Sequence, residues 1–194
     1  MFLESNNHSG YIEVVCGSMF SGKTEELIRR IKRVQIAGQP FKVFKPKVDN
    51  RYSDTEVVSH SRNTIESIVV AKSIDILSLV DDQDEVIGVD EVQFFDEAIV
   101  EVCTALADNG IRVIVAGLDM DYTGQPFGPM AGLLAVAEYV TKVKAICMDC
   151  SSLAHFSYRL SDNEEVVMLG ETKEYIPLCR RCFNKRMKDG FDKE

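Results

Sequence analysis

Short apolar runs alternate with segments of helical periodicity along most of the chain. The apolar runs, rich in β-branched residues, predict strands at 11–16, 41–44, 65–70, 86–89, 112–116 and 140–146. Apolar residues at helical spacing predict helices after Thr24, from an N-cap at Ser73, over 95–109 and up to about residue 138. Several strands are apolar almost throughout, as parallel strands covered on both faces are. This alternation predicts an α/β fold with a mainly parallel sheet, which binds ligands at the carboxyl ends of its strands.

A glycine-rich loop follows the first predicted strand. The stretch GSMFSGKT matches the phosphate-loop motif G-x-x-x-x-G-K-[ST], with a strand before it and a helix after it. Backbone N–H groups and the helix N-terminus then face a polyphosphate, the lysine reaches the outer phosphates, and the threonine hydroxyl ligates Mg²⁺. The predicted phosphate-binding residues are Gly17, Ser18, Met19, Phe20, Ser21, Gly22, Lys23 and Thr24. The fold prediction therefore sharpens to a P-loop NTPase-like (RecA-like) parallel sheet flanked by helices.

Two acids directly follow the predicted strand at 86–89. Asp90 has the usual position of the second magnesium-binding residue of a phosphate-loop protein. Glu91 beside it can take a proton from whatever attacks the γ-phosphate, and is the predicted catalytic base. Attack by water would make the protein an ATPase, and attack by a substrate hydroxyl would make it a kinase. A chain of 194 residues has no room for the second lobe of a helicase-type motor, which favours a kinase.

Charge and hydropathy exclude some partners. The chain carries 31 acidic and 22 basic residues, for a net charge of −9, and shows no long basic stripe. This balance disfavours nucleic acid as a partner. The N-terminus lacks the pattern of a secretory signal, and no window approaches the roughly 18 apolar residues of a membrane span. We therefore expect a cytoplasmic protein that does not interact with membranes.

Four of the six cysteines form two C-x-x-C pairs, separated by 28 residues. Two such pairs can complete a tetrahedral Cys₄ zinc site, and disulfides are disfavoured in the cytoplasm. The predicted ligands of a structural zinc ion are Cys147, Cys150, Cys179 and Cys182. Cys16 and Cys103 lie in apolar runs and are expected to be inert core thiols. The composition shift near residue 146 predicts three parts: a phosphate-loop α/β domain at 1–145, a zinc-binding domain at 146–186, and a disordered tail at 187–194.

Six motifs in this order resemble those of type II thymidine kinase, the cytosolic, zinc-containing family. They are GSMFSGKT, DNRYS, VDEVQFF, AGLDMDYTGQPFG, CMDC and LGETKEYIPLCRRC, and the similarity extends from about Tyr11 to Cys182. The resemblance implies ATP- and Mg²⁺-dependent transfer of the γ-phosphoryl group to the 5′-hydroxyl of thymidine, or of deoxyuridine. The product, dTMP, would serve nucleotide salvage and DNA synthesis. The resemblance also implies a homotetramer inhibited by dTTP.

The same resemblance assigns roles on the donor side. Glu91 corresponds to the general base, and Asp90 serves the magnesium ion. Asp49 and Arg51, in the DNR run, correspond to a loop that contacts the donor, where Arg51 would neutralise charge on the transferring group. Gln93 belongs to a shared segment and is expected near both substrates, as one of the residues that contact the phosphates of ATP.

On the nucleoside side, the insertion between the cysteine pairs corresponds to a lasso that closes over the thymine ring. Its matching residues are Val166, Val167, Met168, Leu169 and Gly170. Tyr175 corresponds to a tyrosine that contacts the nucleoside, and Met19 and Leu118 to apolar neighbours of the base. Tyr122 stands where the family generally has phenylalanine, and Ser157 where some members have threonine near the 5-methyl group. These two departures leave the polarity and the size of the pocket open.

Three alternatives remain at this stage. A phosphate-loop ATPase would use Glu91 to activate water, and a zinc-bearing nucleotide sensor would bind without turnover. A kinase for another deoxynucleoside would keep the same catalytic residues. Fixed backbone groups that read thymine should reject cytosine, because its 4-amino group is a donor where thymine has an acceptor.

Overall fold

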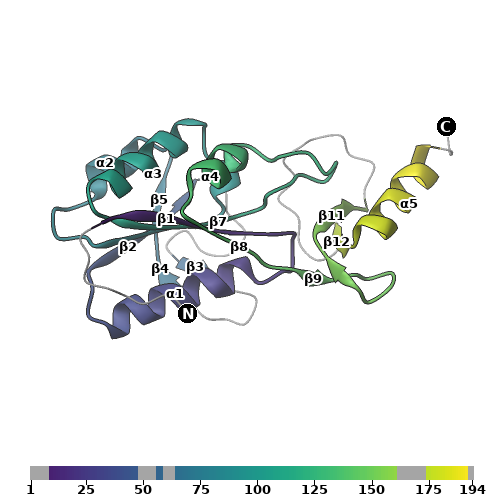
Figure 1. The fold of residues 1–194 in the computed structure, drawn as a ribbon, viewed down its shortest axis with the longest axis horizontal. Coiled ribbons are helices and arrows are strands. Elements are labelled where there is room, and N and C mark those ends of the chain that lie inside the picture. Colours follow the sequence, from purple (N-terminus) through teal and green to yellow (C-terminus); the bar gives the residue numbers. More distant parts are fainter. Residues whose placement is uncertain (1–8, 48–55, 59–63, 161–173, 192–194) are drawn as a thin grey trace.

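A six-stranded parallel sheet forms the centre of the molecule (Figure 1). The structure, a computed structural model, describes residues 9–47, 56–58, 64–160 and 174–191. The strand order is β5-β2-β6-β7-β1-β8, and every neighbouring pair is parallel. The bounds are β1 Tyr11–Cys16, β2 Phe41–Pro46, β5 Ile68–Val70, β6 Val86–Val89, β7 Arg112–Gly117 and β8 Tyr139–Lys142. The predicted parallel α/β sheet is confirmed.

Helices cover both faces of this sheet. In Figure 1, α1 lies below the sheet, and α2, α3 and α4 lie above it. The bounds are α1 Lys23–Ile36, α2 Asp75–Leu79, α3 Ala98–Asp108 and α4 Met130–Val136. In the described part of the chain, no helix has both the length and the apolar character that a bilayer span needs.

The strand residues alternate between two apolar cores. In β7, Val113 and Val115 belong to the core under α3 and α4, whereas Ile114 and Ala116 belong to the core over α1. Helix α1 contributes a buried stripe at the spacing i, i+1, i+4, i+7, made of Leu27, Ile28, Ile31 and Val34. Burial on both faces explains why these strands are apolar almost throughout.

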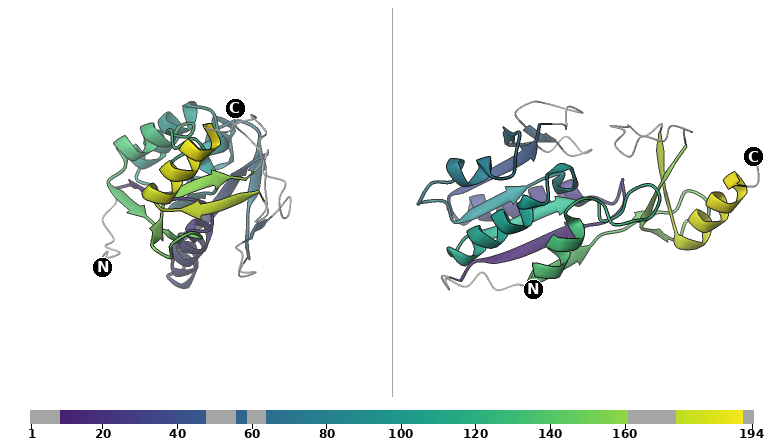
Figure 2. Two further views of the ribbon diagram at one scale, coloured as in Figure 1. Left: turned by 90° about the vertical axis from the view of Figure 1, so that its right-hand side faces the viewer. Right: turned by 90° about the horizontal axis from the view of Figure 1, so that it is seen from above.

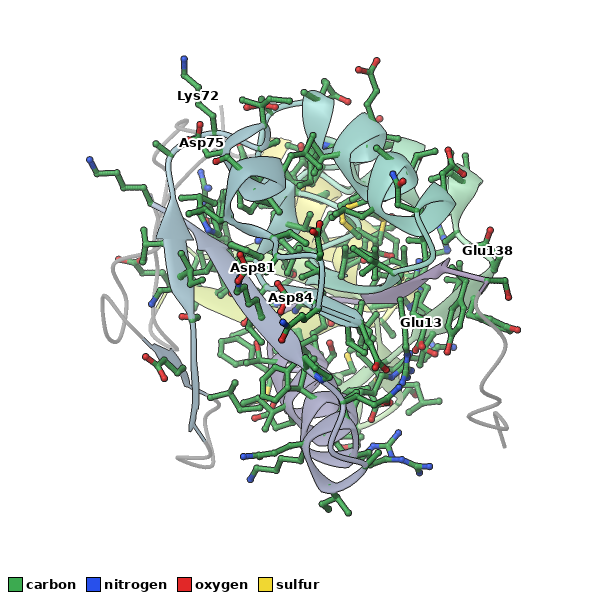
Figure 3. All side chains as sticks on the ribbon, turned by 90° about the vertical axis from the view of Figure 1, so that its left-hand side faces the viewer. Glu13, Lys72, Asp75, Asp81, Asp84 and Glu138 are labelled. Atoms are coloured by element: carbon green, nitrogen blue, oxygen red, sulfur yellow. The ribbon has the colours of Figure 1, made fainter. Side chains whose placement is uncertain are left out.

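Buried ion pairs tie the sheet to its covering helix. Figure 3 views the molecule from the end away from the C-terminal region, with Glu13 and Glu138 labelled. The carboxylate of Glu13, almost fully buried in β1, pairs with Arg30 of α1 and accepts a hydrogen bond of 2.7 Å from Arg112 Nε. Glu138 Oε2 accepts a 2.7 Å hydrogen bond from Ile12 N. We read the acids of this end as structural, because each pairs with the protein itself.

Two of the predicted strands are each divided. Residues 65–70 form two short strands: β4 (Thr64–Glu66) pairs antiparallel with β3 (Glu56–Val58), and β5 joins the main sheet. The buried Ser67 separates them. Likewise β8 ends at Lys142, and β9 (Ala145–Ile146) belongs to another sheet. Apolar alternation predicts extended backbone but not its partner, which explains both errors.

The predicted N-cap of α2 is also wrong. No side chain caps this helix, and the Ser73 side chain is completely buried, without a hydrogen bond in the described part of the chain. Instead, the carboxylate of Asp75 accepts a 3.2 Å hydrogen bond from Lys72 N. Burial of the preceding turn against the core therefore outweighs the local capping preference of serine.

The C-terminal lobe, from β9 to α5, extends beyond the carboxyl ends of the central strands (Figure 2). Its further elements are β10 Leu153–Ala154, β11 Phe156–Arg159, β12 Tyr175–Leu178 and α5 Arg180–Phe191. It has a small core of its own, formed by Ala145, Cys147, Ala154, Phe156, Leu178 and Phe183. Helix α5 reaches into the segment predicted to be a disordered tail, and the predicted domain limits stay a prediction.

Candidate active site

The phosphate loop connects β1 to α1 at the carboxyl edge of the sheet. Gly17 has φ 151° and Gly22 has φ 85°, values that favour glycine. A Cβ on Gly17 would lie 2.3 Å from the carbonyl oxygen of Val143, so this position also lacks room for a side chain. Val143 N in turn donates a 2.8 Å hydrogen bond to the Cys16 carbonyl. The loop is therefore held against the segment that leaves β8.

The cationic side chain of the loop is held over its backbone. Lys23 Nζ donates a 2.9 Å hydrogen bond to the Ser18 carbonyl, which also accepts a 2.7 Å hydrogen bond from Ser21 Oγ. Phe20 takes a left-handed conformation with φ 61°, which is uncommon outside glycine. Helix α1 starts at Lys23, so its first N–H groups face the loop. A lysine, a helix N-terminus and a curled loop together suit a polyphosphate.

The predicted magnesium residues meet at the start of α1. Thr24 Oγ1 donates to Asp90 Oδ2 at 3.2 Å, and Asp90, directly after β6, is only 6% exposed. Asp90 N donates a 2.9 Å hydrogen bond to the Phe44 carbonyl, which fixes the acid to the neighbouring strand. A hydroxyl and a carboxylate are hard oxygen donors of the kind that Mg²⁺ takes in phosphate sites. The donor set therefore fits magnesium, and its binding stays a prediction.

Glu91 lies in a strained turn and is held by a glutamine. Its φ is 49°, in the left-handed region, and its Oε2 accepts a 2.5 Å hydrogen bond from Gln93 Nε2. The Oε1 atom of Gln93 accepts a 3.0 Å hydrogen bond from Leu118 N, just after β7. The predicted base is thus connected to the loop that carries predicted nucleoside-contacting residues.

The phosphate loop also touches the C-terminal lobe. Met19 N donates a 3.0 Å hydrogen bond to Ser157 Oγ of β11, which is buried. Phe20 and Met120, the latter in the loop after β7, pack against the small core of the C-terminal lobe. Three distant segments that carry predicted nucleoside neighbours, namely the phosphate loop, the loop after β7 and β11, therefore meet at the C-terminal lobe.

Arg159, which was not among the predicted site residues, contacts two of the predicted nucleoside residues, Tyr122 and Tyr175. Its guanidinium carbon lies 3.8 Å from the ring centroid of Tyr122. Its Nε and Nη2 atoms donate to the Tyr175 hydroxyl at 3.0 and 2.6 Å, and Arg159 and Tyr175 face each other across the β11–β12 pair. An arginine inside the alternating segment HFSYRL, two residues after Ser157, was the available signal, since buried arginines usually have dedicated partners. Arg159 therefore joins the loop after β7 to the β11–β12 pair.

Asp119 is a further buried residue near the site that was not among the predicted site residues. It lies two residues after the end of β7, and pairs with Lys142 at the end of β8. Burial, with the charge of Asp119 as the next cause, raises the pKa of Cys16 to about 11. Burial alone raises the pKa of Cys103 to about 12. Both thiols therefore stay protonated near neutral pH, as expected for inert core residues.

The four remaining cysteines gather in the C-terminal lobe. The Sγ atoms of Cys147, Cys150, Cys179 and Cys182 all lie within 4.8 Å of one another. All six cysteines are free thiols, and the Cys150 and Cys179 sulfurs are 3.6 Å apart. Tetrahedral zinc with Zn–S bonds of about 2.3 Å needs sulfurs roughly 3.8 Å apart. Hydrogen bonds from Ser152 lower the pKa of Cys150 to about 6, whereas burial and the neighbouring thiols raise the pKa of Cys182 to about 12. The cluster can thus hold a metal ion such as zinc.

Other predicted residues fall outside the described part of the chain. These are the donor-loop residues Asp49 and Arg51 and the lasso residues Val166, Val167, Met168, Leu169 and Gly170. Their roles stay predictions.

Comparison with known proteins agrees with this geometry. The profile of the family described as thymidine kinase matches residues 10–183. A thymidine kinase of Porphyromonas gingivalis is 56% identical over 185 residues, 93% of this chain and 90% of the relative. One of Bacteroides fragilis is 51% identical over 191 residues (98% and 96%), and one of Rhodothermus is 55% identical over 183 residues (94% and 85%). The chain belongs to the thymidine kinase family.

Proposed function

We propose that the chain transfers the γ-phosphoryl group of ATP to the 5′-hydroxyl of thymidine, giving dTMP and ADP. Deoxyuridine, which lacks only the 5-methyl group, would be a second substrate. Membership of the thymidine kinase family supports this activity, and disfavours both the ATPase and the nucleotide sensor.

One observation supports phosphoryl transfer to a second substrate, and not only nucleotide binding. Glu91 lies next to the acid that meets Thr24 at the phosphate loop, and it is connected through Gln93 to Leu118. A carboxylate between a phosphate loop and a second substrate's loop suits a base that acts on a substrate hydroxyl. A base serving only water would not need this second connection.

The donor would bind along the loop from Gly17 to Thr24. Loop N–H groups, the α1 N-terminus and Lys23 would hold the β- and γ-phosphates. Thr24 and Asp90 would hold Mg²⁺, which supplies charge neutralisation at these phosphates when ATP is bound. The four cysteines would hold zinc with all ligand positions filled by sulfur, which suits a structural role.

Phosphoryl transfer then needs one bond made, one broken and one proton moved. The 5′-oxygen of thymidine attacks the γ-phosphorus, and the bond from this phosphorus to the bridging oxygen of ADP breaks. Glu91 accepts the proton that the hydroxyl loses. Closure of the lasso segment, with Val166 to Gly170, would exclude competing water.

The environment of Tyr122 bears on how the thymine ring is held. The guanidinium of Arg159 lies over one face of the Tyr122 ring, and we propose that thymine stacks on the other face. The Tyr175 hydroxyl accepts a hydrogen bond from the same guanidinium, so one cation orients both aromatic residues. The tyrosine at position 122 therefore keeps the stacking surface that phenylalanine offers in the family.

Regulation and assembly follow the family expectation. Because dTTP carries both the thymine base and a triphosphate, it could occupy the nucleoside site and the phosphate loop together. The edge strand β8 leaves Tyr139 and Val140 exposed, and we place an interface of the proposed homotetramer at this edge. Free thiols at the cysteine cluster suit the reducing cytoplasm, our proposed location.

The first experiment measures ADP and nucleoside monophosphate formed with ATP and Mg²⁺, alone and with thymidine, deoxyuridine or deoxycytidine. We expect turnover with thymidine and, more weakly, with deoxyuridine, with one dTMP or dUMP formed per ADP. ADP formation without any nucleoside, at the same rate, would instead identify an ATPase. ATP binding without turnover in any mixture would identify a sensor.

Replacing Arg159 with leucine is expected to raise the KM for thymidine about 10- to 100-fold. The change removes two charge-assisted hydrogen bonds and a cation–π contact, together worth about 1.5–3 kcal/mol. Steady-state kinetics at saturating ATP measure it, and the KM for ATP should stay within about twofold.

Arg180→Leu is the matched control. Arg180 also lies over an aromatic ring of the C-terminal lobe, that of Phe156 at 5.0 Å, but it is exposed. We expect its KM for thymidine to remain near that of the unmodified chain. Equal effects of the two changes would contradict a specific role for Arg159.

A further inference from the structure

Both polar atoms of the Gln93 side-chain amide form hydrogen bonds inside the protein. Its side chain is 3% exposed, its Nε2 donates to Glu91 Oε2 at 2.5 Å, and its Oε1 accepts from Leu118 N at 3.0 Å. Gln93 lies in the short 3₁₀ turn η1 (Val92–Phe94) that directly follows Glu91. Residues far apart in the chain, 91 and 118, are therefore joined by one side chain.

The orientation of this amide follows from chemistry. A backbone N–H can only donate, so the Gln93 atom that faces Leu118 N must be the carbonyl oxygen. The –NH₂ group then faces the carboxylate of Glu91. Reversing the amide would place donor against donor on one side and acceptor against acceptor on the other.

Two glycines make the room that Gln93 occupies. A Cβ on Gly117, the last residue of β7, would lie 2.7 Å from Gln93 Oε1 and 2.8 Å from a methyl carbon of Val92. A Cβ on Gly128 would lie 2.5 Å from the Gln93 carbonyl oxygen, and its φ of 48° itself favours glycine. The side chain and the backbone of Gln93 are thus both held at short range.

The held side chain belongs to a strained backbone. Glu91 has φ 49°, a left-handed conformation that is strained for a residue with a side chain and that persists where the surroundings over-determine it. Such strain clusters at functional sites. The left-handed turn and the buried amide of Gln93 together fix the orientation of the Glu91 carboxylate.

We propose that Gln93 is a positioning residue, which aims the Glu91 carboxylate and couples it to the nucleoside-binding loop after β7. The inference deepens the proposed function and rests on Glu91 being the base. It differs from the predicted contact of Gln93 with the phosphates of ATP. Gln93 acts through Glu91, so its loss misplaces the base without removing a substrate contact.

The test is a double-mutant cycle on kcat with Gln93→Met and Glu91→Gln. Misplacing a catalytic group by about 1 Å can cost about 100-fold, so Gln93→Met should lower kcat about 10- to 100-fold. The KM values for ATP and thymidine should stay within about twofold. In the Glu91→Gln background the second change should lower kcat no further, because the residue it positions is already inactive.

A matched control and a second variant guard against a folding defect. Gln39 donates a 2.9 Å hydrogen bond to the Glu85 carboxylate at the surface, so Gln39→Met removes a similar pair far from the site. It should leave kcat unchanged. Gln93→Glu keeps an acceptor for Leu118 N–H and nearly the same volume but loses the donor, so it should repeat the loss of kcat. Thermal unfolding and ADP binding report on folding in each variant.

Three outcomes decide the inference. Unchanged kcat in a folded Gln93→Met or Gln93→Glu chain overturns it. An undiminished further loss in the Glu91→Gln background also overturns it, because Gln93 then acts on a substrate directly. Near-normal kcat in Glu91→Gln alone is a different failure, that of the proposed base itself.

Discussion

Replacing Glu91 with glutamine is expected to lower kcat about 10²- to 10⁴-fold while ATP binding stays nearly unchanged. Glutamine keeps the shape of the side chain and an oxygen that can accept from Gln93 Nε2, so the turn should survive. It cannot take up the proton of the 5′-hydroxyl. The loss should therefore appear in kcat, measured with saturating thymidine and ATP, and not in nucleotide affinity, measured by titration with ADP.

Two further variants show where the effect arises. Glu101→Gln changes an exposed acid in the first turn of α3 and should leave kcat unchanged. Asp90→Asn removes the carboxylate that meets Thr24, so it should weaken nucleotide binding in the presence of Mg²⁺. If Glu91→Gln turned over at a near-normal rate, another group would have to be the base.

The local parts of the site were predictable from the sequence because their physical requirements are local. Gly17 and Gly22 stand where the loop has positive φ, and Gly17 has no room for a side chain. Each C-x-x-C pair brings two sulfurs together through one short knuckle, so spacing alone indicates a metal site. Asp90 follows directly on a buried strand, which places it at the edge where ligands of parallel sheets bind.

The long-range parts were not predictable in the same way. Gln93 meets Leu118 and Arg159 meets Tyr122 only because the sheet order and the C-terminal lobe bring distant segments together. Periodicity says which face of an element is buried, but not which element packs on it. The same limit explains why residues 65–70 looked like one strand although Ser67 separates two sheets.

We expect the C-terminal lobe to depend on its cysteines more than on its core. Its buried apolar residues are few, and a core of this size rarely supports a fold without a metal or disulfides. Structural zinc in small domains contributes on the order of 10 kcal/mol of folding free energy. Cys179 follows β12, which begins at Tyr175, and its carbonyl accepts a 2.9 Å hydrogen bond from Phe183 N at the start of α5.

Replacing Cys179 with serine is expected to lower zinc content and thymidine affinity together. The change removes one of four sulfurs and weakens the lobe that holds Ser157, Arg159 and Tyr175. Zinc per chain, measured by atomic emission, should fall well below one, and the KM for thymidine should rise at least about tenfold. The phosphate loop belongs to the central sheet, so ADP affinity should change much less.

Removing zinc from the unmodified chain with a strong chelator should reproduce this loss of thymidine affinity, and added zinc should restore it. Cys103→Ala is the matched control, since Cys103 is buried in the sheet core and its loss should leave zinc content unchanged. Full zinc content in Cys179→Ser would falsify the assignment of this ligand. Loss of zinc with unchanged thymidine affinity would keep the metal site but separate it from the nucleoside site, because the lobe would then hold its geometry without the ion.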